Sequence, residues 1–153
     1  MIDRIKSFFS ERLQPTSQDA EHRLRLATAA LLVEVCRADM EISAQERAAV
    51  HSAVREVYGL SAEDTAALVA LAEDEVDEAT SLYGFTRLVN DHFSAEEKAR
   101  IIELMWRVAY VDDYIEKHEQ HLMRKVTSLL YIPHETYIAA KFRARQAARR
   151  ERD

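Results

Sequence analysis

Glycine and proline are scarce in this chain, and this scarcity constrains its fold more than any other feature. Each occurs only twice in 153 residues. Proteins built from strands and tight turns need both residues repeatedly, because glycine adopts left-handed backbone conformations and proline fixes bends. Alanine, leucine, glutamate and arginine are abundant instead, and all of them favour helices. The sequence therefore predicts an all-α protein, a compact bundle of about seven to eight helices.

Hydrophobic periodicity and helix caps locate these helices. Three serines are each followed, three residues later, by an acidic residue, which is the capping-box pattern of a helix start. They are Ser43, Ser61 and Ser94. Apolar residues at helical spacing indicate a short amphipathic helix and a long second helix with one apolar stripe. The expected helices cover 2–13, 17–38, 44–58, 62–78, 80–90, 95–111 and 116–130, and a last one begins at Pro133.

Charge is distributed unevenly along the chain. Residues 141–153 carry six basic and two acidic side chains, whereas residues 1–140 carry 15 basic and 25 acidic ones. An acidic body repels nucleic acid, so we expect no specific nucleic-acid partner. We predict a single domain over 1–140, followed by a basic, solvated helix end or tail over 141–153. A weak contact of this end with acidic lipid, RNA or a protein partner is the alternative.

The sequence also indicates a location. No segment approaches the roughly 18 consecutive apolar residues that a membrane-spanning helix requires. Charged residues interrupt the N-terminal segment, where a secretion signal would have an apolar stretch. We therefore expect a cytoplasmic protein. The 2–13 helix is expected to pack on the domain, with peripheral membrane contact through Phe8 and Phe9 as the alternative.

An internal repeat is the strongest sign of organisation. In each copy an apolar helix leads to an aspartate, with isoleucine three residues later and glutamate seven residues later. We expect two pseudo-symmetric helix–acidic turn–helix units, at 24–60 and 97–133. A shift of 73 residues aligns Leu31 with Leu104, Val35 with Val108, Asp39 with Asp112, Ile42 with Ile115, Glu46 with Glu119 and Tyr58 with Tyr131.

The two acidic turns are candidates for a cation site. If the units pack about a pseudo-twofold axis, the turns lie side by side and pool their carboxylates. Divalent cations such as Ca²⁺ and Mg²⁺ need several oxygen ligands converging in one place. The sequence therefore predicts a site for a divalent cation (Ca²⁺, Mg²⁺, Mn²⁺ or Zn²⁺), without the loop of an EF-hand. Its candidate ligands are Asp39, Glu46, Asp112 and Glu119, with Asp113 and Glu116 as neighbouring carboxylates.

Helix capping is the alternative explanation of the same residues. Glu46 is expected to complete the capping box of Ser43. The acids at 116 and 119 lie near a helix start, where the helix dipole favours negative charge. Asp39 and Asp112 can accept hydrogen bonds from N–H groups of their own turns. At the level of sequence both interpretations stay open.

The pattern Asp-x-x-Ile-x-x-x-Glu after an apolar helix resembles the TerB (tellurite-resistance protein B) family. It also resembles the related N-terminal domain of membrane-anchored DnaJ-like co-chaperones. The resemblance covers about 24–140, although Met40 replaces a usual glycine and Asp113-Tyr114 replaces a usual Gly-Glu. It implies a helical bundle with a bacterial tellurite or general stress role. It further implies an acidic metal-binding surface formed by Asp39, Glu41, Glu46, Asp112 and Glu119.

Sequence motifs of enzymes are lacking. The chain has no glycine-rich phosphate loop, nucleophile elbow or HExxH motif. Cys36 is expected to be a buried, unreactive thiol. His118 and His121 are too few for a zinc site and are expected to be exposed polar residues. We predict a non-enzymatic binding module, with a metal-free adaptor that binds a protein partner through a helix groove as the alternative.

Overall fold

The computed structural model describes residues 8–13, 20–39, 41–72, 78–112, 115 and 117–152. Every regular element in these residues is helical, which confirms the all-α prediction. A short helical segment at 8–12 precedes the longer helices. These are α2 (Ala20–Ala38), α3 (Ala44–Tyr58), α4 (Ala62–Ala72), α5 (Glu78–His92), α6 (Ala95–Ala109), α8 (Glu119–Leu129) and α9 (His134–Arg152).

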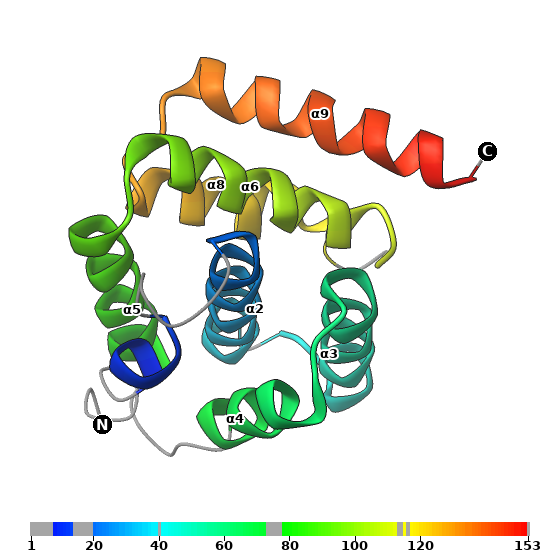
Figure 1. The fold of residues 1–153 in the computed structure, drawn as a ribbon. Coiled ribbons are helices and arrows are strands. Elements are labelled where there is room, and N and C mark those ends of the chain that lie inside the picture. Colours follow the sequence, from blue (N-terminus) through cyan, green and yellow to red (C-terminus); the bar gives the residue numbers. More distant parts are fainter. Residues whose placement is uncertain are drawn as a thin grey trace.

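The bundle is organised around α2. This helix contacts α3, α4, α5 and α6, and Figure 1 shows it in the middle of them. The α8 helix packs against α5 and α6, whereas α9 lies across the outside of α6. None of the described helices is long and apolar enough to cross a membrane.

The central position of α2 follows from its residues. Ala29, Ala30, Leu31 and Leu32 follow one another along the helix, and each is at most 1% exposed. A helix that is apolar on all sides belongs in the interior of a protein. The buried surface of α2 is therefore wider than the single apolar stripe expected for this helix, because neighbouring helices cover α2 on several sides. The burial extends to Glu34, whose carboxylate accepts a hydrogen bond from Arg37 at 3.2 Å.

Helix starts follow the predicted caps. The hydroxyls of Ser43 and Ser94 accept N–H bonds from the third residue of their helices, and both reciprocal glutamate bonds are present. The Ser61 hydroxyl accepts from the Asp64 N–H at 3.1 Å. The Asp64 carboxylate forms an ion pair with Arg12 at 3.3 Å and contacts Nε2 of His22 at 3.0 Å. Asp64 therefore connects the N-terminal segment and α2 to α4.

The described part of the N-terminal segment packs on the domain, as expected. Phe8 and Phe9 are 7% and 4% exposed, so these phenylalanines belong to the core. Arg23, itself 5% exposed, holds the segment in place. Its Nε donates to the Leu13 carbonyl at 2.6 Å, and its Nη1 contacts Glu97 at 3.0 Å. One buried guanidinium thus links the segment, α2 and the start of α6.

The two units of the expected repeat differ at their ends. Tyr58 is 1% exposed, whereas Tyr131 is 81% exposed. Gly59 ends α3 with φ +62°, and the left-handed residue after α8 is Tyr131, with φ +56°. The N–H groups of Leu60 and Ile132, which come next, each donate to a carbonyl five residues earlier. Tyr131 therefore corresponds to Gly59, and the expected equivalence of Tyr58 and Tyr131 is wrong. The duplication itself stays a prediction.

Candidate functional site

Both acidic turns contain a buried aspartate that caps its own turn. Asp39 is 9% exposed and directly follows α2, and Asp112 is 8% exposed and follows the end of α6. Oδ1 of Asp39 accepts the Glu41 N–H at 3.0 Å, and Oδ1 of Asp112 accepts the Ile115 N–H at 3.2 Å. The capping role expected for these two aspartates is therefore confirmed.

Both aspartates act on Cys36, which is completely buried. Burial raises the pKa of the Cys36 thiol to about 12; the Arg47 guanidinium opposes this rise, and the carboxylates of Asp112 and Asp39 add to it. Both aspartates therefore contribute to the electrostatic environment of this buried thiol. Two carboxylates that are 73 positions apart in the sequence thus act on the same buried group.

Basic side chains also act on other groups of the acidic turns. The pKa of Glu46 is lowered, first by hydrogen bonds from the Ser43 backbone and side chain, and then by His118; Asp39 raises it. His118 at the start of α8 thus acts on Glu46 of α3, the helix that follows the first turn. Arg47 of α3 acts on Cys36 as well, so basic side chains contribute to the electrostatic environment of both groups.

A small pocket opens beside Asp39. Its volume is about 20 Å³, which is sufficient for one water molecule or one ion. Asp39, His121 and Lys125 provide its polar groups. The rest of the lining is apolar and comes from Val35, Leu82 and Leu122.

The remaining candidate ligands are less enclosed or are not described. Glu41 is exposed, and Glu46 is partly exposed and accepts the Ser43 N–H at 3.0 Å. Glu119 begins α8, but its side chain is outside the described part of the structure. Asp113 and Glu116 also lie outside the described residues.

The described residues therefore fit a cation only in part. Both turns contain a buried carboxylate, but no group of three histidine, cysteine, aspartate or glutamate side chains in the described part of the chain is arranged to hold a metal ion. A complete ligand set needs further oxygens, from water or from the acids at 113, 116 and 119.

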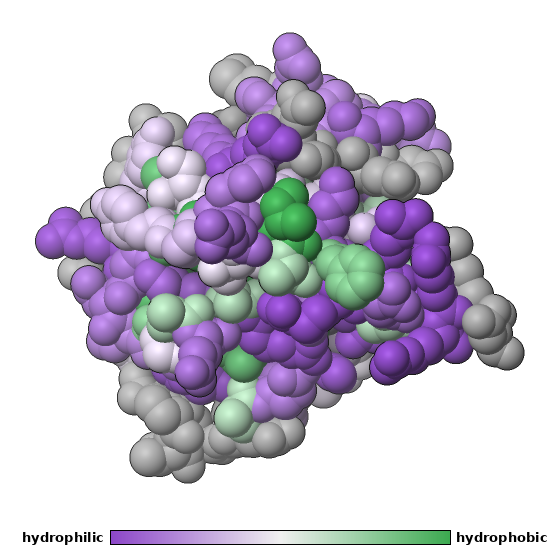
Figure 2. Space-filling model, turned by 90° about the horizontal axis from the view of Figure 1, so that it is seen from above, coloured by the Kyte–Doolittle hydropathy of each residue, from purple (hydrophilic) through white to green (hydrophobic). Residues whose placement is uncertain are grey.

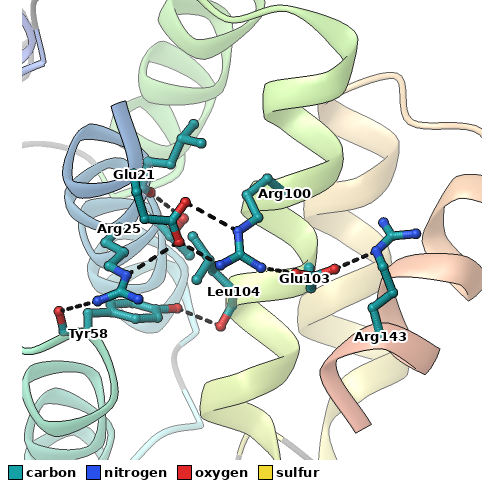
Figure 3. A network of polar contacts seen from close by, with 9 residues as sticks. Glu21, Arg25, Tyr58, Arg100, Glu103, Leu104 and Arg143 are labelled. Atoms are coloured by element: carbon teal, nitrogen blue, oxygen red, sulfur yellow. Dashed lines mark hydrogen bonds and ion pairs between the residues drawn. The ribbon is translucent and has the colours of Figure 1, made fainter. Parts of the chain in front are cut away.

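A second polar cluster was not anticipated from the sequence. Glu103 on α6 is 8% exposed and pairs with Arg100 and with Arg143 of α9. Arg100 also contacts Glu21 of α2 at 2.5 Å, so the chain of ion pairs in Figure 3 joins three helices. The spacing of Arg100 and Glu103 on one helix face is the only sequence signal of this cluster. Because the partners come from α2 and α9, the cluster holds these helices against α6.

A buried tyrosine lies in the same view. The Tyr58 hydroxyl donates to the Leu104 carbonyl of α6 at 2.8 Å. Arg25 of α2 donates to the carbonyl of Tyr58 at 3.4 Å. The end of α3 is therefore fixed to two helices by hydrogen bonds as well as by packing.

Comparison with known proteins identifies the family. The family model described as Tellurite resistance protein TerB matches residues 25–142, which include both acidic turns. No curated protein and no solved structure matches this chain at a significant level. The family match spans α3 to α8 completely, together with most of α2 and the first half of α9. By this match the chain belongs to the TerB family.

Proposed function

We propose that this chain is a cytoplasmic, non-enzymatic TerB-type binding module whose two acidic turns hold a divalent cation. The observation that carries the proposal is the pair of buried aspartates, Asp39 and Asp112, each held by a hydrogen bond in its own acidic turn, with a pocket of about 20 Å³ beside Asp39. A carboxylate is costly to bury without a counter-charge, and a bound cation would offset this cost. The pocket admits a water or an ion and is far too small for an organic substrate.

The donor set indicates which cation to expect. Asp39 and Asp112 would supply carboxylate oxygens, and Glu46 or Glu119 would add further ones. Oxygen ligands suit Ca²⁺, Mg²⁺ and Mn²⁺, whereas Zn²⁺ would require an imidazole such as that of His121. Carboxylates at 113 and 116 are further candidates by their position in the sequence.

Thermal unfolding of metal-stripped protein with each of these ions tests the proposal. A cation at 100 times its dissociation constant adds about 2.7 kcal/mol to the free energy of unfolding. For a domain of this size that corresponds to a rise in Tm of about 5–11 °C. The rise should disappear in Asp39→Asn/Asp112→Asn, because asparagine keeps an acceptor oxygen for the turn but removes the charge.

The matched control removes two negative charges elsewhere. Glu63 on α4 and Asp91 on α5 are exposed, so Glu63→Gln/Asp91→Asn should keep the full response to the cation. Two results would sink the proposal: no change in Tm with any ion at millimolar concentration, or an equal loss in both double variants.

A metal-free adaptor is the second candidate. It is favoured by the basic side chains around the acidic turns, because they already offset part of the negative charge: Lys125 lines the pocket beside Asp39, Arg47 acts on Cys36, and His118 acts on Glu46. In this case the acidic surface would steer a basic protein partner. Binding of that partner would weaken with salt and persist in EDTA.

The family relationship supports a role in the response to tellurite or to general stress. Growth of cells with and without this chain in the presence of tellurite tests that role. Cells that carry Asp39→Asn/Asp112→Asn should resemble cells that lack the chain if the acidic turns are required. Unchanged growth of cells without the chain would contradict the tellurite role.

A further inference from the structure

The outer face of α9 combines large apolar side chains with arginines. Ile138 is 47% exposed and Phe142 is 58% exposed, and they stand one helical turn apart. Arg145 and Arg149 continue the same line along the helix, and both are exposed. Figure 2 looks down on this side of the molecule and shows apolar surface at its centre with hydrophilic side chains around it. We call these four residues the outer face of α9.

The opposite face of α9 already provides the contacts that hold the helix to the domain. Tyr137, Ala140 and Ala144 are at most 2% exposed and belong to the core. Lys141 lies 4.6 Å from the centre of the Trp106 ring, and Arg143 pairs with Glu103. The packing of α9 on α6 therefore needs neither Ile138 nor Phe142. Because these two exposed side chains do not hold α9 in place, substitutions at these positions should leave the fold intact.

Charge gives this face a preferred kind of partner. Residues 141–153 have a net charge of +4, whereas residues 1–140 have a net charge of −10. A negatively charged surface attracts α9 and repels most of the remaining molecule. The attraction and the repulsion together orient the protein with the outer face of α9 toward such a surface.

We propose that the outer face of α9 binds the anionic surface of a lipid membrane. The interface of a bilayer accepts both the aliphatic Ile138 and the aromatic Phe142, and arginine side chains extend from there to the lipid phosphates. Nucleic acid would use the arginines and stack on Phe142, but it offers no apolar surface for Ile138. The contact is peripheral and reversible, because only two large apolar side chains would enter the interface.

Co-sedimentation of the full chain with vesicles tests this proposal. We expect binding to phosphatidylglycerol vesicles at low ionic strength, loss of binding as salt is added, and no binding to phosphatidylcholine vesicles. Each positive charge that is removed should weaken binding about fivefold. Phe142→Ser/Arg145→Glu should therefore weaken binding by more than that factor. EDTA should have no effect, which separates this surface from the proposed cation site.

The chain offers a matched control on α5. Tyr83 is 53% exposed and Arg87 is exposed, so Tyr83→Ser/Arg87→Glu removes an aromatic ring and changes the charge by the same amount. This variant should bind vesicles as the wild type does. Circular dichroism and Tm establish that both double variants remain folded.

Three results would overturn the proposal. The first is a failure of the wild type to bind phosphatidylglycerol vesicles at low ionic strength. The second is an equal loss of binding in the α9 and α5 variants. The third is binding of an RNA probe, or self-association, that depends on Phe142 and Arg145 while vesicles do not bind.

Discussion

The hydrogen bond between Tyr58 and Leu104 provides a quantitative test of how α3 is held to α6. The Tyr58 hydroxyl is buried, and it donates to the Leu104 carbonyl at 2.8 Å. Tyr58→Phe removes the hydroxyl and keeps the ring, so the apolar packing of the side chain is retained. A buried hydrogen bond between neutral groups contributes about 0.5–1.5 kcal/mol to the free energy of unfolding. We therefore expect a loss of about 1 kcal/mol and a fall in Tm of about 2–4 °C.

Urea titration and thermal unfolding measure this loss, and Tyr131→Phe is the control. Tyr131 is 81% exposed, although the 73-residue shift aligns it with Tyr58. Its substitution should change the free energy of unfolding by less than about 0.5 kcal/mol. If Tyr58→Phe leaves the free energy of unfolding unchanged, or if the two substitutions lower it equally, the idea that this hydroxyl holds α3 to α6 is refuted.

Three further predictions concern buried or capping groups. Because burial first of all raises the pKa of Cys36 to about 12, the folded chain keeps a proton that the unfolded chain loses near pH 9. The free energy of unfolding, measured by urea titration, should therefore fall as pH rises from 9 to 12. The fall should be smaller in Cys36→Ala. Burial, and then Arg47, lower the pKa of His51 below its usual 6.5, so its contribution to stability is complete above pH 6.5 and is lost as pH falls below 6.5 through the lowered pKa. The fall in Tm on acidification should therefore be smaller in His51→Gln than in the wild type. Ser94→Ala removes the cap of α6 and should cost about 1 kcal/mol in urea titration, whereas an unchanged midpoint would contradict the cap's contribution.

Helix starts were predictable because their signals are local. The serine at 43 and the glutamate at 46 lie within one turn of each other, and the observed α3, Ala44–Tyr58, agrees with the expected 44–58. The start of α6 has the same origin, a cap at Ser94. Capping boxes depend on neighbouring residues alone, so the sequence contains the information needed to place them.

Features that depend on distant segments were not predictable in the same way. The periodicity of α2 indicated one apolar stripe, but the number of buried sides depends on how many helices pack around it. The pairing of Glu103 with Arg143 joins positions 40 apart on two helices. The different environments of Tyr58 and Tyr131 arise because Tyr131 occupies the left-handed position that Gly59 has after α3. A repeat found by alignment therefore locates the turns better than it locates the ends of the helices.

Capping and cation binding are compatible roles for the two buried aspartates. A cap fixes the orientation of a carboxylate through one oxygen, as the bonds at Oδ1 of Asp39 and Asp112 show. A carboxylate held in this way is preorganised as a ligand, because little conformational freedom remains to be lost when an ion binds. From the sequence alone the two roles are competing explanations, since both use the same residue types at the same positions. The two roles differ in whether they need the charge of the aspartates. The cap needs only an acceptor oxygen, which asparagine also supplies, whereas the cation needs the negative charge.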